Sequence, residues 1–81
     1  NYPNPFNPQT QIQFGLPEAS SVTLTVYDVA GRRVAMLFKD ARMEAGWHTA
    51  VFDGQHLASG VYFARVRFDG RVQISKMTLV K

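Results

Sequence analysis

Apolar and polar residues alternate along most of this chain. Ile12, Phe14 and Leu16 share one face of the first predicted strand, and Gln11 and Gln13 share the other. A period of two is typical of a half-buried β-strand, whereas an amphipathic helix would place its apolar residues about one helical turn apart. No helical stripe occurs in the chain, so the sequence predicts an all-β fold.

The same alternation recurs in later segments. Val22, Leu24 and Val26 form the predicted core face of a second strand rich in β-branched residues. Residues 40–45 mix charged residues with Ala and Met, and a loop suits them better than a helical turn. The predicted strands cover residues 10–16, 22–27, 33–39, 46–52, 61–68 and 71–80.

Turn-forming residues separate the predicted strands. Asp28 and Gly31 flank one reversal, where an Asp side chain can bond to nearby turn amides and a Gly accepts positive φ. Asp53 ends a later strand and Gly60 opens the next one. We therefore expect these four residues to have structural roles in turns.

The last hairpin allows its register to be tested from the sequence. A two-residue turn at Asp69 and Gly70 would pair Val66 with Gln73, which puts an apolar and a polar residue on the same face. A three-residue loop with a left-handed Gly70 would instead pair Val66 with Val72. We therefore expect the longer, bulged turn.

About seven short strands and no convincing helix favour an immunoglobulin-like antiparallel β-sandwich, with a small barrel as the alternative. The chain has no cysteine, so no disulfide can join the sheets. Trp47 or Tyr62 is then expected to be the central packing residue of the core. The length of 81 residues allows a single domain, residues 1–81, whose stability should be marginal because short chains bury less of their surface.

The first nine residues differ from the rest of the chain. Three prolines and three asparagines occur within the first eight residues. Each proline fixes its own φ and keeps the preceding residue out of the helical region, so residues 1–9 are predicted to form an extended arm that leads into the sandwich. We expect the rings of Tyr2 and Phe6 to pack on the domain, or alternatively on a partner.

Composition and charge narrow the class of protein. Apolar residues make up 46% and charged residues 19%, which indicates a folded domain rather than a disordered one. The net charge of +3 favours contact with anionic surfaces without specifying one. The lack of cysteine fits either a reducing compartment or an exported protein that relies on packing. No apolar run is long enough to span a bilayer, and any export signal is expected upstream in a longer precursor.

The sequence shows no set of residues typical of an enzyme. His48 and His56 lie on different predicted elements and lack a second ligand at zinc-binding spacing, so we interpret both as structural. Asp28, Asp53 and Asp69 all end strands, where a carboxylate commonly accepts hydrogen bonds from turn amides. We therefore predict no catalytic residue, no metal and no cofactor.

Arginines gather near two of the predicted turns. Arg65, Arg67 and Arg71 lie around the last hairpin, and Arg32 and Arg33 on an earlier one. A phosphate-rich partner would suit such a cluster. The aromatic residues, however, alternate toward the core and form no exposed stacking platform. We interpret the arginines as a solvated sheet face that discourages edge pairing, and expect no nucleic-acid partner.

Several motifs occur in a fixed order from one end of the chain to the other. They are Tyr2-Pro3-Asn4-Pro5-Phe6-Asn7-Pro8, Val26-Tyr27-Asp28 with Gly31-Arg32 and Val34, Gly46 leading to Phe52-Asp53, Leu57 with Ser59-Gly60-Val61-Tyr62, and Lys76-Met77 with Leu79 and Lys81. In order and spacing the chain resembles the type A C-terminal sorting domain of the type IX (Por) secretion system. A related look-alike is the immunoglobulin-like domain of flagellar hook-capping proteins.

The resemblance implies a non-catalytic module at the C-terminus of a larger secreted protein, in a didermal bacterium of the Bacteroidota kind. It implies that the type IX translocon recognises the folded domain, and that an associated sortase commonly removes it while attaching the cargo to anionic lipopolysaccharide. The cargo would lie in cis, N-terminal to the domain. It would travel through the periplasm and outer membrane to the cell surface or exterior. We expect the isolated domain to be a monomer.

The positions that match the family's recognition elements lie at the two ends of the chain. They are Tyr2, Pro3, Asn4, Pro5 and Phe6 in the arm, and Lys76, Met77, Leu79 and Lys81 in the last strand. The expected mode of recognition is strand addition, in which a partner strand pairs with the terminal strand through main-chain hydrogen bonds.

Two other functions are open at this point. A module that attaches a secreted enzyme to cells or to carbohydrate would use exposed aromatic side chains, and its candidates are Trp47, Tyr27 and Tyr2. An enzyme in its own right is the weakest hypothesis, because the residues that catalysis needs do not come together in the sequence.

Overall fold

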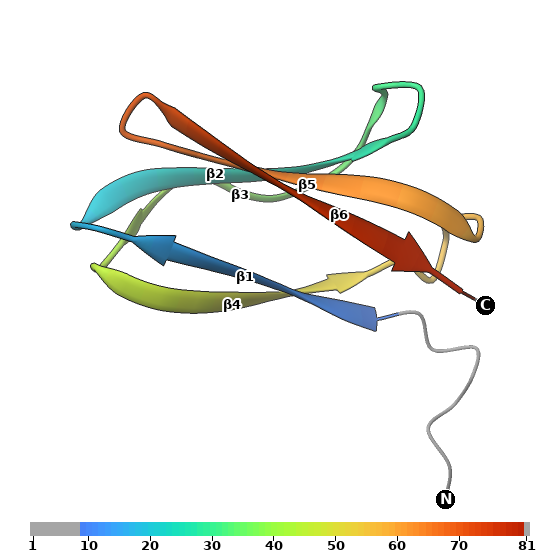
Figure 1. Ribbon diagram of the computed structural model, residues 1–81, viewed down its shortest axis with the longest axis horizontal. Coiled ribbons are helices and arrows are strands. Elements are labelled where there is room, and N and C mark those ends of the chain that lie inside the picture. The colour runs from blue at the N-terminus through green and yellow to red at the C-terminus, as the bar shows by residue number, and fades with distance from the viewer. Residues whose placement is uncertain (1–8, 81) are drawn as a thin grey trace, which may run out of the picture.

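The computed structural model describes residues 9–80, which form two antiparallel β-sheets (Figure 1). One sheet pairs β1 with β4, and the other has four strands in the order β3-β2-β5-β6. These residues contain no helix. The strands are β1 (Gln9–Leu16), β2 (Ser20–Asp28), β3 (Arg33–Met43), β4 (Gly46–Asp53), β5 (Gly60–Phe68) and β6 (Arg71–Leu79).

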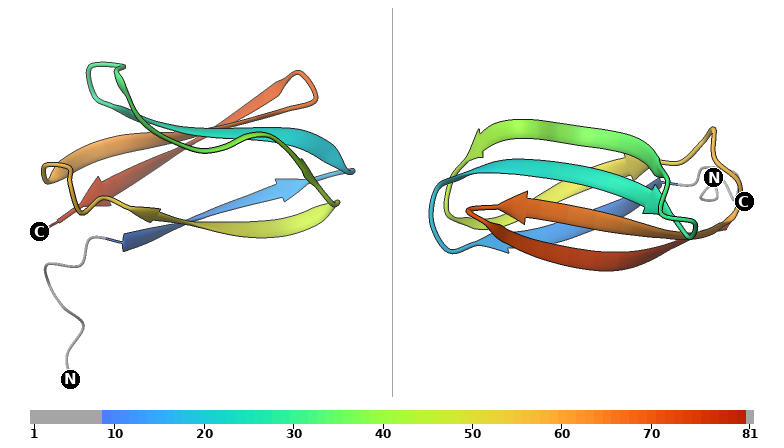
Figure 2. Two further views of the ribbon diagram at one scale, coloured as in Figure 1. Left: turned by 180° about the vertical axis from the view of Figure 1, so that it is seen from behind. Right: turned by 90° about the horizontal axis from the view of Figure 1, so that it is seen from above.

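The two sheets pack face to face as a sandwich (Figure 2). The chain crosses from one sheet to the other at residues 17–19, 44–45 and 54–59. Separate sheets with free edges rule out the closed barrel, and the immunoglobulin-like sandwich is confirmed. Residues 9–80 contain six strands, whereas the sequence predicted about seven for the chain.

The core forms where the inward faces of the two sheets meet. Val22, Leu24 and Val26 of β2 are fully buried, as the alternation predicted. They are joined by alternate residues of the other strands, because burying apolar side chains from both inner faces drives the sheets together. The other buried apolar residues are Ile12, Phe14, Leu16, Ala50, Phe52, Tyr62, Ala64, Val66, Phe68, Met77 and Leu79.

Tyr62 holds the corner through which the chain enters β5. Its ring is buried, and its hydroxyl donates a hydrogen bond of 2.7 Å to the carbonyl oxygen of Ala58. This arrangement matches the tyrosine corner of immunoglobulin-like sandwiches, in which a Tyr near the start of a strand bonds to backbone a few residues upstream. The prediction that Tyr62 packs in the core is confirmed.

Trp47, by contrast, is not a core residue. It is 83% exposed, so the expectation that it packs centrally is wrong. Ala50 and Phe52 are the buried residues of β4, and Trp47 has the opposite parity. Its ring lies over Gly15, its cross-strand partner on β1, where a Cβ would come within 3.3 Å of the ring.

The third strand is longer than predicted. Residues 40–43, expected to be a loop, continue β3 to Met43 and pair with the start of β2. The strand bends at Asp40, whose φ is +52° and whose amide donates to Thr23 Oγ1 at 3.1 Å. The pairing with β2 shifts register around this point. Such an irregularity breaks the regular alternation of apolar and polar residues by which the sequence predicts a strand.

The β5–β6 hairpin has a two-residue turn. Asp69 and Gly70 have φ values of +50° and +72°, as a type I′ turn requires, and Val66 pairs with Gln73. The expected three-residue loop, with Val66 opposite Val72, is therefore wrong. The left-handed conformation of Gly70 is confirmed. A type I′ turn already matches the twist of its flanking strands, so no extra loop residue is needed.

Burial explains how the mixed face is tolerated. Val66 lies in the core, but Gln73 is on the edge strand β6 and lines a surface hollow with residues of β1 and β4. Ser75 lines a second groove, between β6 and β1. Only Met77 and Leu79 of β6 are buried, at 7% and 2% exposure. Polar residues therefore occupy the part of β6 that faces the open side of the sandwich.

The ends of the described chain lie at the same pole of the sandwich (Figure 1). Gln9, at the start of β1, pairs with Asp53 at the end of β4. Gly54 follows directly and packs against the side chain of Leu79, at the end of β6. The β2–β3 turn and the β4–β5 connection lie at this pole too.

Candidate functional site

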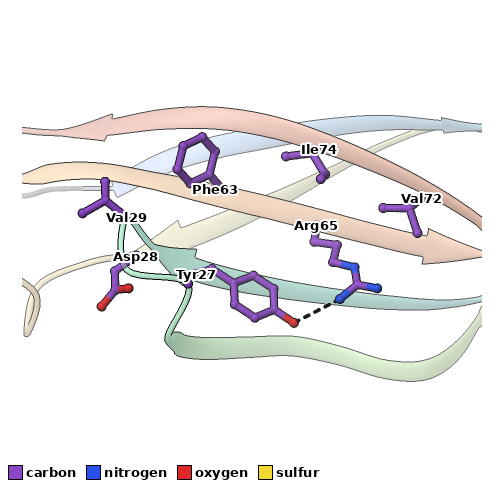
Figure 3. Close-up of a pocket in the computed structure, with 8 residues that line it drawn as sticks. Tyr27, Asp28, Val29, Phe63, Arg65, Val72 and Ile74 are labelled. Atoms are coloured by element: carbon purple, nitrogen blue, oxygen red, sulfur yellow. Dashed lines mark hydrogen bonds between the residues drawn. The ribbon is translucent and has the colours of Figure 1, made fainter.

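An exposed apolar patch lies on the outer face of the four-stranded sheet, which points away from the core (Figure 3). We define this outer patch by Tyr27, Val29, Phe63, Val72 and Ile74. The side chains line a shallow hollow of about 650 Å³. The hollow is completed by Asp28, Gly31 and Arg65.

The register of three strands places these residues together. Phe63 of β5 lies opposite Tyr27 of β2, and Arg65 lies opposite Ile74 of β6. Opposed residues of antiparallel strands point to the same face. Val72 is two positions from Ile74 and therefore shares that face. The two-residue turn at the start of β6 thus sends its first apolar residues outward.

The outer patch is well exposed to water. The exposed fractions are 73% for Val29, 65% for Ile74 and 46% for Val72. Single exposed apolar residues are common on soluble proteins, but a contiguous group is typical of an interaction site. The grouping on one face, more than any single exposure, makes this surface the leading candidate site.

Cationic side chains surround the outer patch. Within residues 9–80 the structure shows a single ion pair, between Arg32 and Asp28. The cations around the outer patch therefore have no carboxylate partner within those residues. Nη1 of Arg65 donates to the hydroxyl of Tyr27 at 3.5 Å, which is a weak hydrogen bond (Figure 3). Among the cations that share this face by register are Arg33, Arg65, Arg67 and Lys76.

Asp28, beside the outer patch, is engaged within its own turn. Its Oδ1 accepts hydrogen bonds from the amides of Ala30 at 3.0 Å and Arg32 at 2.9 Å, and its Oδ2 accepts one from Arg32 Nε at 3.1 Å. The backbone bond from Arg32 is the main cause that holds the pKa of the Asp28 carboxyl below its ordinary value. The carboxylate is paired with Arg32 and points away from Phe63 and Ile74 (Figure 3).

The edge strand β6 is a second candidate surface. It pairs with β5 on one side only, so alternate main-chain groups on its other side have no strand partner in the sheet. Lys76 points outward with Phe63, whereas Met77 and Leu79 are buried. In the folded domain Met77 and Leu79 therefore anchor the end of β6 to the core, whereas the other side chains of this strand, Lys76 among them, are exposed.

Part of the predicted recognition set lies outside the described residues. The positions concerned are Tyr2, Pro3, Asn4, Pro5, Phe6 and Lys81.

The structure places the predicted turn residues in turns or at the ends of strands. Gly31 has a φ of +83° in the β2–β3 turn, and Gly60 opens β5. Asp53 accepts a hydrogen bond of 3.0 Å from the amide of Gln55 through Oδ1. With Asp28 and the Tyr62 corner, these residues shape the pole at which the described chain begins and ends.

The aromatic candidates for carbohydrate binding lie on opposite outer faces. Trp47 is exposed on the two-stranded sheet, and Tyr27 is half-buried within the outer patch. Tyr2 lies outside the described residues. The structure therefore does not bring Trp47 and Tyr27 into one site.

The two histidines do not form a common site. The ring of His48 stacks on Phe14 with centroids 5.5 Å apart, and its Nε2 lies 2.7 Å from the carbonyl oxygen of Glu44. His56 is exposed in the β4–β5 connection. Residues 9–80 bring no three His, Cys, Asp or Glu side chains into a metal-binding group. In the same stretch, no helix has the length and apolar character needed to cross a bilayer.

The outer patch was not predicted from the sequence, although the order of apolar residues in β6 indicates it. The apolar residues of β6 are Val72 and Ile74, then Met77 and Leu79. The first pair has even numbers and the second pair odd numbers, so a regular strand cannot turn both pairs to the same face. The structure buries the second pair and exposes the first.

Comparison with known proteins identifies the family. The family model described as "Secretion system C-terminal sorting domain" matches residues 1–81, the whole of the chain. No match was found among curated proteins or among solved structures. Because the family model matches the whole chain, the chain belongs to the family of secretion system C-terminal sorting domains.

Proposed function

We propose that this domain directs an attached cargo protein through the type IX secretion system to the cell surface or exterior. Members of its family are sorting signals for that system. The secretion machinery recognises them and exports the attached proteins out of the cell. The observation that carries the proposal is the family match over the whole chain. The cargo, N-terminal and in cis, would supply any activity, and the domain itself would be non-catalytic.

Recognition by strand addition suits the edge strand β6. Its unpaired backbone edge offers main-chain hydrogen bonds, and Lys76 offers an exposed charge beside it. Met77 and Leu79 hold this edge against the core, so a partner strand meets a fixed register. The arm residues Tyr2, Pro3, Asn4, Pro5 and Phe6, together with Lys81, complete the proposed recognition set.

The proposal includes three partners. The type IX translocon binds the folded domain, an associated sortase removes it, and the cargo becomes linked to anionic lipopolysaccharide. The basic outer sheet face and the net charge of +3 are compatible with an anionic environment at the cell surface.

A reporter fusion tests the proposed function. Residues 1–81 are fused after a periplasmic reporter in a host that has the secretion system, and the reporter is measured in the periplasm, at the surface and in the medium. We expect export that depends on a functional translocon. Retention of the fusion in the periplasm to the same extent as the reporter alone would exclude the proposal.

A second candidate function is favoured by one observation, the exposure of Trp47. Its ring lies over Gly15, which leaves the opposite ring face open to the apolar face of a sugar. Gln13 and Thr49, neutral hydrogen-bonding residues, pair on the same outer face. Trp47 is the only tryptophan, so its fluorescence reports binding directly. An unchanged spectrum during titration with bacterial and plant polysaccharides would reject this function.

A further inference from the structure

The apolar character of the outer patch is not explained by the fold. Val72 and Ile74 contribute little to the core, since both are substantially exposed at the edge of the sheet. Polar residues at these positions would suit a solvated strand equally well. Val29 adds a third exposed apolar side chain from a separate element, the β2–β3 turn. Three strands and a turn thus present apolar side chains to one shallow hollow, which indicates that something covers it.

The charges around the outer patch indicate the chemistry of that cover. Arg65 borders the hollow, and Arg33, Arg67 and Lys76 share its face by register. None of the four is in an ion pair within residues 9–80. A partner that presents carboxylates around apolar side chains would complement this surface in both respects.

Other occupants fit less well. The segment before Gln9 contains no acidic residue, so it offers the cations no partner. A second copy packed through the same face would bring like charges together. A flat lipid surface meets an obstacle, because the β2–β3 and β5–β6 turns rise at opposite ends of this face (Figure 1). A narrow segment of protein can reach the floor between those turns.

We propose that the outer patch docks an extended protein segment of the secretion machinery that carries apolar and acidic residues. Ile74, Val72 and Phe63 contact its apolar side chains, and Arg65 pairs with one of its carboxylates. This inference rests on the proposed function, and it assigns a recognition surface distinct from the free edge of β6.

Export of matched variants tests the surface. Ile74→Lys and Arg65→Glu are made in the reporter fusion. Val51→Lys is the control, since Val51 is similarly exposed, at 56%, on the outer face of the other sheet. We expect export to fall about tenfold for both patch variants and to stay unchanged for the control. Melting temperatures of the isolated variants must match the wild type, and Ile74→Thr replaces any variant that does not fold.

The outcomes separate the two proposals. If the wild-type fusion is not exported, the proposed function fails and the docking inference fails with it. If the wild type is exported and the folded patch variants are exported equally well, the docking inference alone is overturned.

A photocrosslinking residue at position 74, with position 51 as its control, identifies the occupant in the exporting cell. An adduct to an acidic segment of a translocon protein supports the inference. Adducts only to lipid, to residues 1–8 or to a second copy overturn it.

Discussion

At the residue scale, Tyr62 shows how a single polar atom can fix a corner of an apolar core. The hydroxyl reaches the carbonyl oxygen of Ala58 at 2.7 Å while the ring stays buried. A buried hydroxyl without a partner would be costly, so the bond also selects one path for the chain between β4 and β5.

Removing this hydroxyl should weaken the fold. Tyr62→Phe is expected to lower the free energy of unfolding by about 1 kcal/mol, the net value of a typical intramolecular hydrogen bond, as measured by urea denaturation. Tyr27→Phe is the control, because that hydroxyl makes only a 3.5 Å contact with Arg65. The control should stay within about 0.5 kcal/mol of the wild type. Equal losses for both variants would contradict the corner role.

Gly54 is required by its neighbour in space. A Cβ at this position would collide with Cδ1 of Leu79, which is only 2% exposed and has no room to swing aside. Gly54→Ala is therefore expected to cost about 1–3 kcal/mol of unfolding free energy, as overpacked cores do.

The matched test of this contact adds Leu79→Ala. Because the smaller side chain leaves space for the new methyl group, the double variant should be more stable than the sum of the two single losses predicts. Simple additivity in denaturant unfolding would show that the clash is not the cause.

Asp28 links the β2–β3 turn to pH. Its folded-state pKa is lowered, chiefly by the backbone hydrogen bond from Arg32. The unfolded chain therefore takes up the proton first as the pH falls, and stability is lost as the pH drops from the ordinary value of 3.8 through the lower folded value. Above 3.8 the contribution is fully present.

A pH series of unfolding experiments checks this sign. The stability difference between the wild type and Asp28→Asn should be largest above pH 3.8 and should shrink as the solution becomes more acidic. Asn keeps an oxygen for the turn amides but cannot gain the charge. A difference that grows on acidification would contradict the assignment.

At the element scale, the β5–β6 turn decides which side chains of β6 face outward. Both turn residues have positive φ, so the hairpin needs residues that tolerate the left-handed region. Gly70→Ala should cost about 1 kcal/mol in thermal or urea unfolding. Asp69→Asn should change stability by less than about 0.5 kcal/mol, because Asn accepts positive φ. A Gly70→Ala variant with unchanged stability would contradict the two-residue turn.

The strands of this protein differ in how well their sequences predict them. Ile12, Phe14 and Leu16 alternate regularly, and β1 is as predicted except for one residue at its start. The prediction ended β3 too early. Asp40 bends this strand, and a bulge interrupts the alternation on which the prediction depends. In β6 the alternation changes phase, and sequence alone does not show which half a second sheet will cover.

At the scale of the whole molecule, the sandwich followed from period-two alternation, but the surfaces did not. Trp47 or Tyr62 was expected at the centre of the core because no disulfide joins the sheets, whereas the parity along β4 places Trp47 outside. The outer patch is formed by three strands and a turn, so it can be recognised only when these four elements are placed together. A candidate site made of apolar residues is hard to predict, because apolar residues in a strand pattern are equally typical of the buried core.

The common pole of the described chain has a mechanical consequence. If an N-terminal cargo pulls on the chain, the load reaches the described residues at Gln9, the end of β1 that pairs with Asp53. If the domain were held at the end of β6 at the same pole, the load would peel β1 away from β4 one pair at a time, rather than shear all eight pairs at once. Hydrogen bonds broken in sequence resist far less force than hydrogen bonds broken together. The same load would act on β6 where it is held, because its last residue, Leu79, pairs with Gly60 at this pole, so both terminal strands would open from the ends at which they are loaded.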